Sequence, residues 1–207
     1  MADLDLPSLV LGFAALHRVD REGPRGDGET TEALLAARGF PAHAAALGFE
    51  ARYGGLRVFE PGADPPALVV GPYSCLASSP YSKGERDLVP VIFGADDAIY
   101  SLDTRGRGWT CAAMVESVSR PSARDGRQLL AQAILWRALV NHPAGFVTTE
   151  GVHGAERASE RGLSPLADAT SDHESWWADA SQLVVEIAYG NGYAGPMTYA
   201  TARARPG

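Results

Sequence analysis

The stretch Phe49-Glu50-Ala51-Arg52-Tyr53-Gly54-Gly55-Leu56 decides how this chain is expected to fold. Its first half continues an apolar stripe at four-residue spacing, Ala45, Phe49 and Tyr53, which is typical of one face of a helix. The two glycines end that helix, because glycine adopts the left-handed conformation that a sharp corner requires. The alternating residues 56–59 follow at once and predict a strand.

A second stretch, about thirty residues later, extends the sheet. Leu88-Val89-Pro90-Val91-Ile92-Phe93 and Ala98-Ile99-Tyr100-Ser101-Leu102 indicate two strands, joined by the acidic turn Gly94-Ala95-Asp96-Asp97. Residues 67–70 predict a strand before this pair, and Trp109 to Val115 predict one after it. Together these segments favour an antiparallel meander.

Three helices accompany the predicted strands. One runs from Thr30 or Thr31, either of which can cap it, to Gly39. Pro41 suits the first turn of the helix that ends at the glycine pair, and a third helix begins at Ser122 or Asp125 and carries a broad apolar stripe. Residues 71–87 predict an exposed loop. The fold class is therefore α+β, an antiparallel meander with the helices packed on one face of the sheet.

The aromatic residue before Gly54-Gly55-Leu56, and Phe93-Gly94-Ala95-Asp96-Asp97 with Tyr100-Ser101-Leu102-Asp103 after it, resemble motifs of the SUKH superfamily. The resemblance covers residues 31–140, about half of the chain. It implies the same α+β layout, and it implies a bacterial immunity protein that binds and blocks a toxin, although the superfamily also has members outside toxin systems.

The chain after Asn141 has no counterpart in that resemblance. Some thirty residues are too polar and irregular to assign, Ser175-Trp176-Trp177 predicts the start of a short helix, and residues 182–189 predict a last strand or hairpin. We expect residues 1–207 to form a single domain in which residues 141–207 are a C-terminal extension packed on the rest.

Composition narrows the class of partner. The 18 Lys and Arg against 25 Asp and Glu give a net charge of -7, which repels a nucleic-acid backbone. This acidity suits a cationic protein partner, and the alternative is that it only keeps the chain soluble. Two cysteines, Cys75 and Cys111, are too few for a disulfide framework and indicate a reducing compartment. We expect no secretion signal at the start of the chain, and its apolar run 9–16 is too short to span a membrane. We therefore expect a cytoplasmic protein that binds neither nucleic acid nor membranes.

The sequence carries no signature of a known chemistry. There is no phosphate-binding loop, and the five histidines are scattered without the spacing of zinc ligands. Asp96, Asp97 and Asp103 could gather carboxylates for a cation or for acid and base work, but acidic residues are also what tight turns prefer. We expect no cofactor and no metal.

A binding protein needs only a shaped surface with aromatic anchors and complementary charge. The residues that we expect to contact the partner are aromatic side chains in or beside loops and acidic side chains that supply negative charge: Glu50, Tyr73, Tyr81, Asp96, Asp97, Asp103 and Trp109. The predicted function is a non-catalytic immunity or interaction protein that blocks a partner, for example a basic toxin domain. Two alternatives stay open: an enzyme or small-ligand-binding protein whose site is assembled from distant residues, and a scaffold or regulatory subunit.

Overall fold

The computed structural model describes residues 5–6, 10, 18–77, 87–95, 98–112, 120–140, 147–150, 154–179, 182–187 and 198–203. Its main element is a seven-stranded antiparallel sheet in which every strand pairs with its neighbour in sequence, in the order β1-β2-β3-β4-β5-β6-β7. The strands are β1 (Arg18–Asp20), β2 (Arg57–Phe59), β3 (Leu68–Val70), β4 (Val89–Gly94), β5 (Ala98–Leu102), β6 (Gly108–Ala112) and β7 (Arg120–Ala123). The predicted meander is confirmed, and β1 and β7 extend it.

Helices cover one face of this sheet, as the sequence predicts. They are α2 (Gly28–Ala37), α3 (Ala44–Tyr53), α4 (Pro72–Ala77) and α5 (Gly126–Val140). Strand pairing places one set of side chains on the same face, and these are at most 4% exposed: Val58, Leu68, Val70, Ile92, Tyr100 and Leu102. A Cβ on Gly126 of α5 would touch both Phe49 of α3 and Leu102, so α3 and α5 lie on that face together.

Two helices begin a few residues away from their predicted starts. Asp27 caps α2, because its carboxylate accepts the backbone N–H of Thr30 at 2.8 Å. The Nδ1 atom of His43 accepts the N–H of Ala46 and caps α3. In both cases the capping residue lies before the apolar stripe from which the helix was predicted.

The predicted loop of residues 71–87 contains a helix where it was expected to be irregular. Helix α4 (Pro72–Ala77) follows Gly71 directly, and Ser74, Cys75 and Leu76 are buried. Proline is well suited to a first helical position. The part of this loop that includes Tyr81, residues 78–86, lies outside the described residues.

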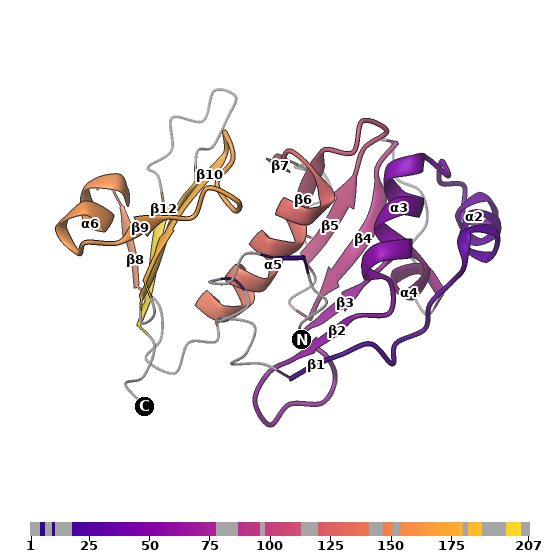
Figure 1. Cartoon of the computed structure of the whole chain (residues 1–207), viewed down its shortest axis with the longest axis horizontal. Helices are drawn as coiled ribbons and strands as arrows, with labels where there is room; N and C mark the ends of the chain where they lie inside the picture. The colour runs from indigo at the N-terminus through magenta and orange to yellow at the C-terminus, as the bar shows by residue number, and fades with distance from the viewer. Residues whose placement is uncertain are drawn as a thin grey trace.

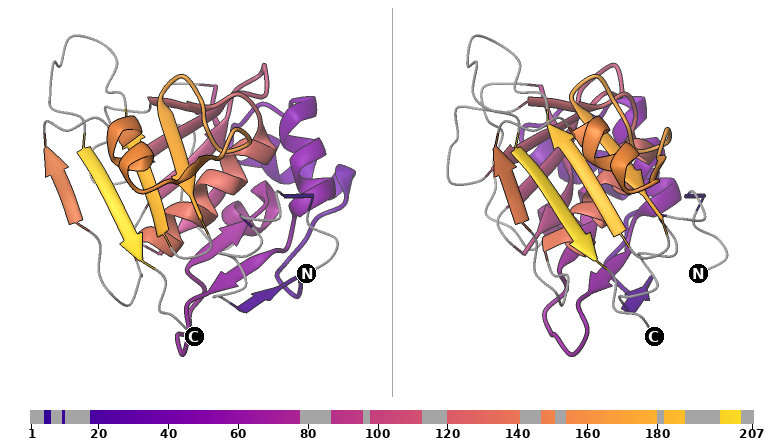
Figure 2. Two further views of the ribbon diagram at one scale, coloured as in Figure 1. Left: turned by 60° about the vertical axis from the view of Figure 1, so that its left-hand side comes forward. Right: turned by 90° about the vertical axis from the view of Figure 1, so that its left-hand side faces the viewer.

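A second sheet forms the other side of the molecule. Its order is β8-β12-β11-β10-β9, and the strands are β8 (Val147–Glu150), β9 (Ser164–Pro165), β10 (Glu174–Ala178), β11 (Gln182–Ile187) and β12 (Thr198–Arg203), with α6 (Gly154–Glu160) beside it. Figure 1 shows α5 between the two sheets, and Figure 2 shows the strands of the second sheet in front of α5 when the molecule is viewed from that side. One hydrophobic core includes residues of both sheets and of α5.

The predicted helix at Ser175-Trp176-Trp177 is wrong, because these residues lie in strand β10. Burial alternates along this strand, with Glu174, Trp176 and Ala178 buried and the residues between them half-buried. The ring of Trp176 packs edge-on against Trp136 of α5 at 5.4 Å between centroids. Of the last strand or hairpin predicted at residues 182–189, residues 182–187 form strand β11, which pairs with the later strand β12, and residues 188–189 lie outside the described residues.

Candidate functional site

The face of the seven-stranded sheet that points away from the helices carries half-buried apolar side chains. Val69 pairs with Phe93 and Phe93 pairs with Ile99, so the three lie side by side across β3, β4 and β5. Trp109 pairs with Ser101, which follows Ile99 by two positions and therefore shares its face. All four are half-buried. We call Val69, Phe93, Ile99 and Trp109 the outer patch.

Trp109 is held in place by Asp103. The indole Nε1 of Trp109 donates to Oδ2 of Asp103 at 3.2 Å, and Nε of Arg107 donates to the same oxygen at 2.8 Å. Partial burial raises the pKa of Asp103, but hydrogen bonds from the backbone of Arg107, the indole, the guanidinium and the backbone of Arg105 together bring the pKa below its ordinary value of 3.8. Asp103 therefore stays ionised well into the acid range.

Arg107 completes this corner of the sheet. Its guanidinium carbon lies 5.9 Å from the centroid of the Trp109 ring, and its side chain is 49% exposed. The favourable contact between a guanidinium and an indole face adds to the ion pair with Asp103. The result is a half-buried tryptophan whose indole N–H is held by a hydrogen bond and whose neighbouring arginine side chain is half exposed.

Glu50 was predicted to contact a partner, but the structure places it in the interior, where it is 1% exposed. Its carboxylate accepts the N–H of Gly26 at 3.1 Å through Oε1 and the N–H of Tyr73 at 3.1 Å through Oε2. Burial raises its pKa above the ordinary value of 4.5, against the lowering effect of these two bonds and of Arg25. Glu50 thus joins three segments of the chain and presents no carboxylate to a partner.

Tyr73 lies beside Glu50 and away from the outer patch. It is half-buried in the first turn of α4, and its ring contacts the loop before α2, because a Cβ on Gly26 would come 2.6 Å from the ring. The structure therefore brings Glu50 and Tyr73 together at one place, and Asp103 and Trp109 at another. Tyr81, Asp96 and Asp97 lie outside the described residues.

A cavity of about 590 Å³ opens next to Glu50, between the start of α2 and the middle of α3. The cavity is lined by one basic residue, two acidic residues and four small or apolar residues. These are Arg25, Gly26, Asp27, Gly28, Leu47, Glu50 and Ala51. Arg25 donates to the carbonyl oxygen of Ala51 at 2.9 Å across the cavity wall. The Asp27 carboxylate is already engaged with Thr30.

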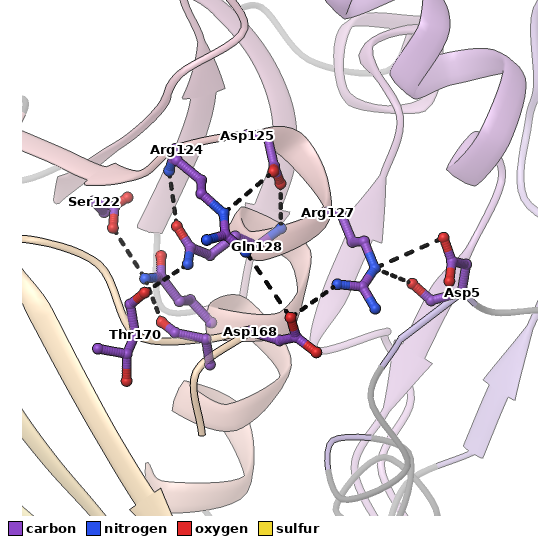
Figure 3. Close-up of polar contacts among 10 residues, drawn as sticks. Asp5, Ser122, Arg124, Asp125, Arg127, Gln128, Asp168 and Thr170 are labelled. Atoms are coloured by element: carbon purple, nitrogen blue, oxygen red, sulfur yellow. Dashed lines mark hydrogen bonds and ion pairs between the residues drawn. The ribbon is translucent and has the colours of Figure 1, made fainter. Parts of the chain in front are cut away.

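Polar contacts also gather at the first turns of α5, where the second sheet meets the helix (Figure 3). The side-chain amide of Gln128 donates to the carbonyl of Thr170 at 2.7 Å, and that of Gln132 donates to the carbonyls of Ser122 and Ala169, each at 2.9 Å. Both glutamines are 1% exposed. These residues connect parts of the fold and contribute no open surface.

Within the described ranges, no group of three or more His, Cys, Asp or Glu side chains has the arrangement of a metal site. The helices that the structure describes include none with the length and apolar character needed to cross a membrane. No protein-family model matches the chain, and no curated protein and no solved structure matches it significantly. The resemblance to the SUKH superfamily therefore stays a prediction.

The partner-binding residues predicted from the sequence include Trp109 but not Val69, Phe93 or Ile99. All three occupy the positions of an alternating strand that point away from the helices, where an antiparallel sheet with one solvated face normally carries polar residues. Apolar residues at both sets of positions of β3, β4 and β5 were the available signal. Strands that are apolar on both faces are expected to pack against other groups on both faces of the sheet.

Proposed function

We propose that this chain is a non-catalytic binding protein of the immunity type, which blocks a cationic partner protein, such as a toxin domain, by covering it with the outer face of the seven-stranded sheet. The observation that carries this proposal is the outer patch, three apolar side chains and a fixed tryptophan on the sheet face opposite the helices. Clustered apolar surface of this kind marks interaction sites on proteins.

The chemistry of the outer patch suits a protein partner. Tryptophan and arginine are the residues that most often dominate binding energy, and here Trp109 and Arg107 lie against each other. Phe93, Ile99 and Val69 extend the contact area across the three neighbouring strands. An interface of this composition would gain its affinity from apolar burial around one aromatic anchor.

Charge indicates which partner would be selected. The chain has a net charge of -7, which accelerates encounter with a cationic protein. Asp96 and Asp97 fall between β4 and β5 in the sequence, the two strands that carry Phe93 and Ile99. Their negative charge would add to the attraction of a cationic partner, and the resemblance to the SUKH superfamily supports the same class of partner.

The test is photo-crosslinking in the source organism. A benzophenone amino acid replaces Ile99 on the outer patch, and in a matched control it replaces Ala36, which is exposed on α2. The proposal predicts one dominant adduct from position 99, to a basic protein whose activity the purified chain blocks at equimolar concentration. Equal adducts from both positions, or a captured protein whose activity is unaffected, would contradict it.

The cavity beside Glu50 favours a second candidate function, the binding of a small polar ligand. Its volume of about 590 Å³ falls within the range of ligand sites, and its lining includes the basic residue Arg25. Thermal unfolding of the purified chain in the presence of a metabolite library tests this candidate. A stabilising compound whose effect is lost in Arg25→Ala would support it, and no stabilisation by any compound would count against it.

A further inference from the structure

We infer that Asp103 is a positioning residue of the outer patch, which orients Trp109 and Arg107 for the partner and does not contact the partner itself. This inference rests on the proposed function. It replaces the expectation that Asp103 offers its charge to a cationic surface, and it follows from how the two carboxylate oxygens are used.

The two oxygens of Asp103 have separate tasks. Oδ1 accepts the backbone N–H groups of Arg105 and Arg107, each at 2.9 Å, and so closes the turn between β5 and β6. Oδ2 accepts the Nε–H of Arg107 and the Nε1–H of Trp109. One oxygen therefore shapes the backbone, and the other holds two side chains.

This arrangement leaves Asp103 poorly placed to bind a partner directly. The residue is 9% exposed, its two oxygens accept four hydrogen bonds, and the ion pair with Arg107 compensates its charge. Trp109 and Arg107, in contrast, keep surface that faces solvent. The carboxylate can influence binding only through them.

Orientation before binding has a predictable effect on affinity. A large side chain that is free to change rotamer must be ordered when the partner binds, which costs roughly 0.5–1.5 kcal/mol, or up to about tenfold in affinity. Asp103 removes that cost in advance for the indole and for the guanidinium. Loss of the Oδ2 bonds alone releases both side chains and should therefore weaken capture of the partner by about five- to 150-fold.

Asp103→Asn separates the two tasks. The asparagine oxygen can still accept the turn N–H groups in place of Oδ1, whereas its NH₂ group faces two donors in place of Oδ2 and cannot accept from them. Asp103→Ala removes both sets of bonds, and Asp64→Asn, at an exposed loop position, is the matched control. Thermal unfolding confirms that each variant is folded.

Two readouts are needed, one on the free protein and one on capture. In the free protein, hydrogen exchange of the Trp109 indole N–H is followed by nuclear magnetic resonance, with its signal assigned by its absence in Trp109→Phe. We expect this exchange to accelerate about tenfold or more in Asp103→Asn, since a hydrogen bond to a charged acceptor is lost, and to stay unchanged in Asp64→Asn. Unchanged indole exchange in Asp103→Asn would overturn the inference.

Capture is measured as the yield of the adduct from the benzophenone at position 99, in the background of each variant. The inference predicts that Asp103→Asn lowers this yield and Asp64→Asn does not. One outcome would overturn the role of Asp103 but not that of the outer patch. In that outcome Asp103→Asn exchanges its indole proton faster yet captures the partner undiminished, whereas Trp109→Ala loses capture. Undiminished capture in Trp109→Ala would instead refute the outer patch as the docking surface.

Discussion

Replacing Glu50 with alanine gives a direct measure of how this fold is held together. Glu50 is a buried carboxylate on α3 that accepts one backbone N–H from the loop before α2 and another from the first turn of α4. The side chain fits because Gly54 and Gly71 have no Cβ, which would come 2.3 Å and 2.5 Å from its two oxygens. Glu50→Ala leaves both N–H groups without their acceptor.

The expected cost follows from those two bonds. A buried donor left without a partner costs about 1–3 kcal/mol, so two of them cost on the order of 4 kcal/mol, and release of a desolvated carboxylate returns part of this. We expect Glu50→Ala to lower the free energy of unfolding by about 3 kcal/mol, and the melting temperature by about 6–12 °C for a chain of this size. Glu50→Gln, which keeps one acceptor, should cost roughly half as much.

The effect of pH has a defined sign. Burial raises the folded-state pKa of Glu50 above its ordinary value of 4.5, so the folded protein binds this proton more tightly than the unfolded chain does. The stability that this proton contributes is present below pH 4.5 and is lost as pH rises through the folded-state pKa. The wild-type chain should therefore gain stability relative to Glu50→Gln as pH falls from neutral towards 4.5.

Urea unfolding followed by circular dichroism measures both effects. Glu32→Ala is the matched control, because Glu32 is exposed on α2 and such changes usually alter stability by less than about 0.5 kcal/mol. If Glu50→Ala costs no more than Glu32→Ala, the carboxylate does not connect the three segments. A stability difference between the wild type and Glu50→Gln that shrinks on acidification would show that the pKa is not raised.

Three further predictions concern other residues. Gly71→Ala should destabilise the fold by more than about 2 kcal/mol in urea unfolding, because Gly71 has a φ of +106° and its new Cβ would lie 2.5 Å from Glu50; a cost below about 0.5 kcal/mol would contradict this packing. Gln132→Ala should lower the free energy of unfolding by about 2–3 kcal/mol, because the buried side-chain amide donates to two carbonyls, that of Ser122 in β7 of the first sheet and that of Ala169 between β9 and β10 of the second. Backbone amide hydrogen exchange should accelerate more in β10 than in α2. Equal acceleration in both elements would argue against this role. The wild type should be more stable than Asp103→Asn by its full margin above pH 3.8, and this margin should fade as pH falls through the lowered pKa of Asp103. Urea unfolding measured at a series of acidic pH values checks this. A margin that persists at still lower pH would show that the Asp103 carboxylate is not its source.

The sequence was sufficient to predict the meander and the helices on one face. Within residues 49–59 an apolar stripe at helical spacing is followed directly by a glycine pair and then by alternating strand residues. The local sequence is therefore enough to predict this helix, corner and strand. Helix α4 was missed because its first turn depends on Glu50, whose bond to Tyr73 spans 23 residues. Strand β10 is not predicted because Trp176 packs against Trp136 of α5, a contact between residues forty positions apart that the local sequence does not indicate.

The candidate site shows the same division between local and long-range information. Trp109 was predicted from its residue type and its place beside a turn. Glu50 and Asp103 were expected on the surface because they are charged, yet their acceptor atoms meet donors that only the folded chain supplies. Phe93 and Ile99 fit an ordinary strand pattern, since a sequence does not state which face of a sheet the helices cover.

The central claim is that the outer face of the seven-stranded sheet binds a protein partner. Titration calorimetry of the captured partner against Trp109→Ala tests it most directly, with Trp177→Ala, another half-buried tryptophan on the second sheet, as the control. We predict that Trp109→Ala weakens the Kd by about thirtyfold or more, as expected for an anchor residue worth at least about 2 kcal/mol, and that Trp177→Ala leaves it within about threefold. Equal effects of the two substitutions, or an unchanged Kd in Trp109→Ala, would contradict the claim.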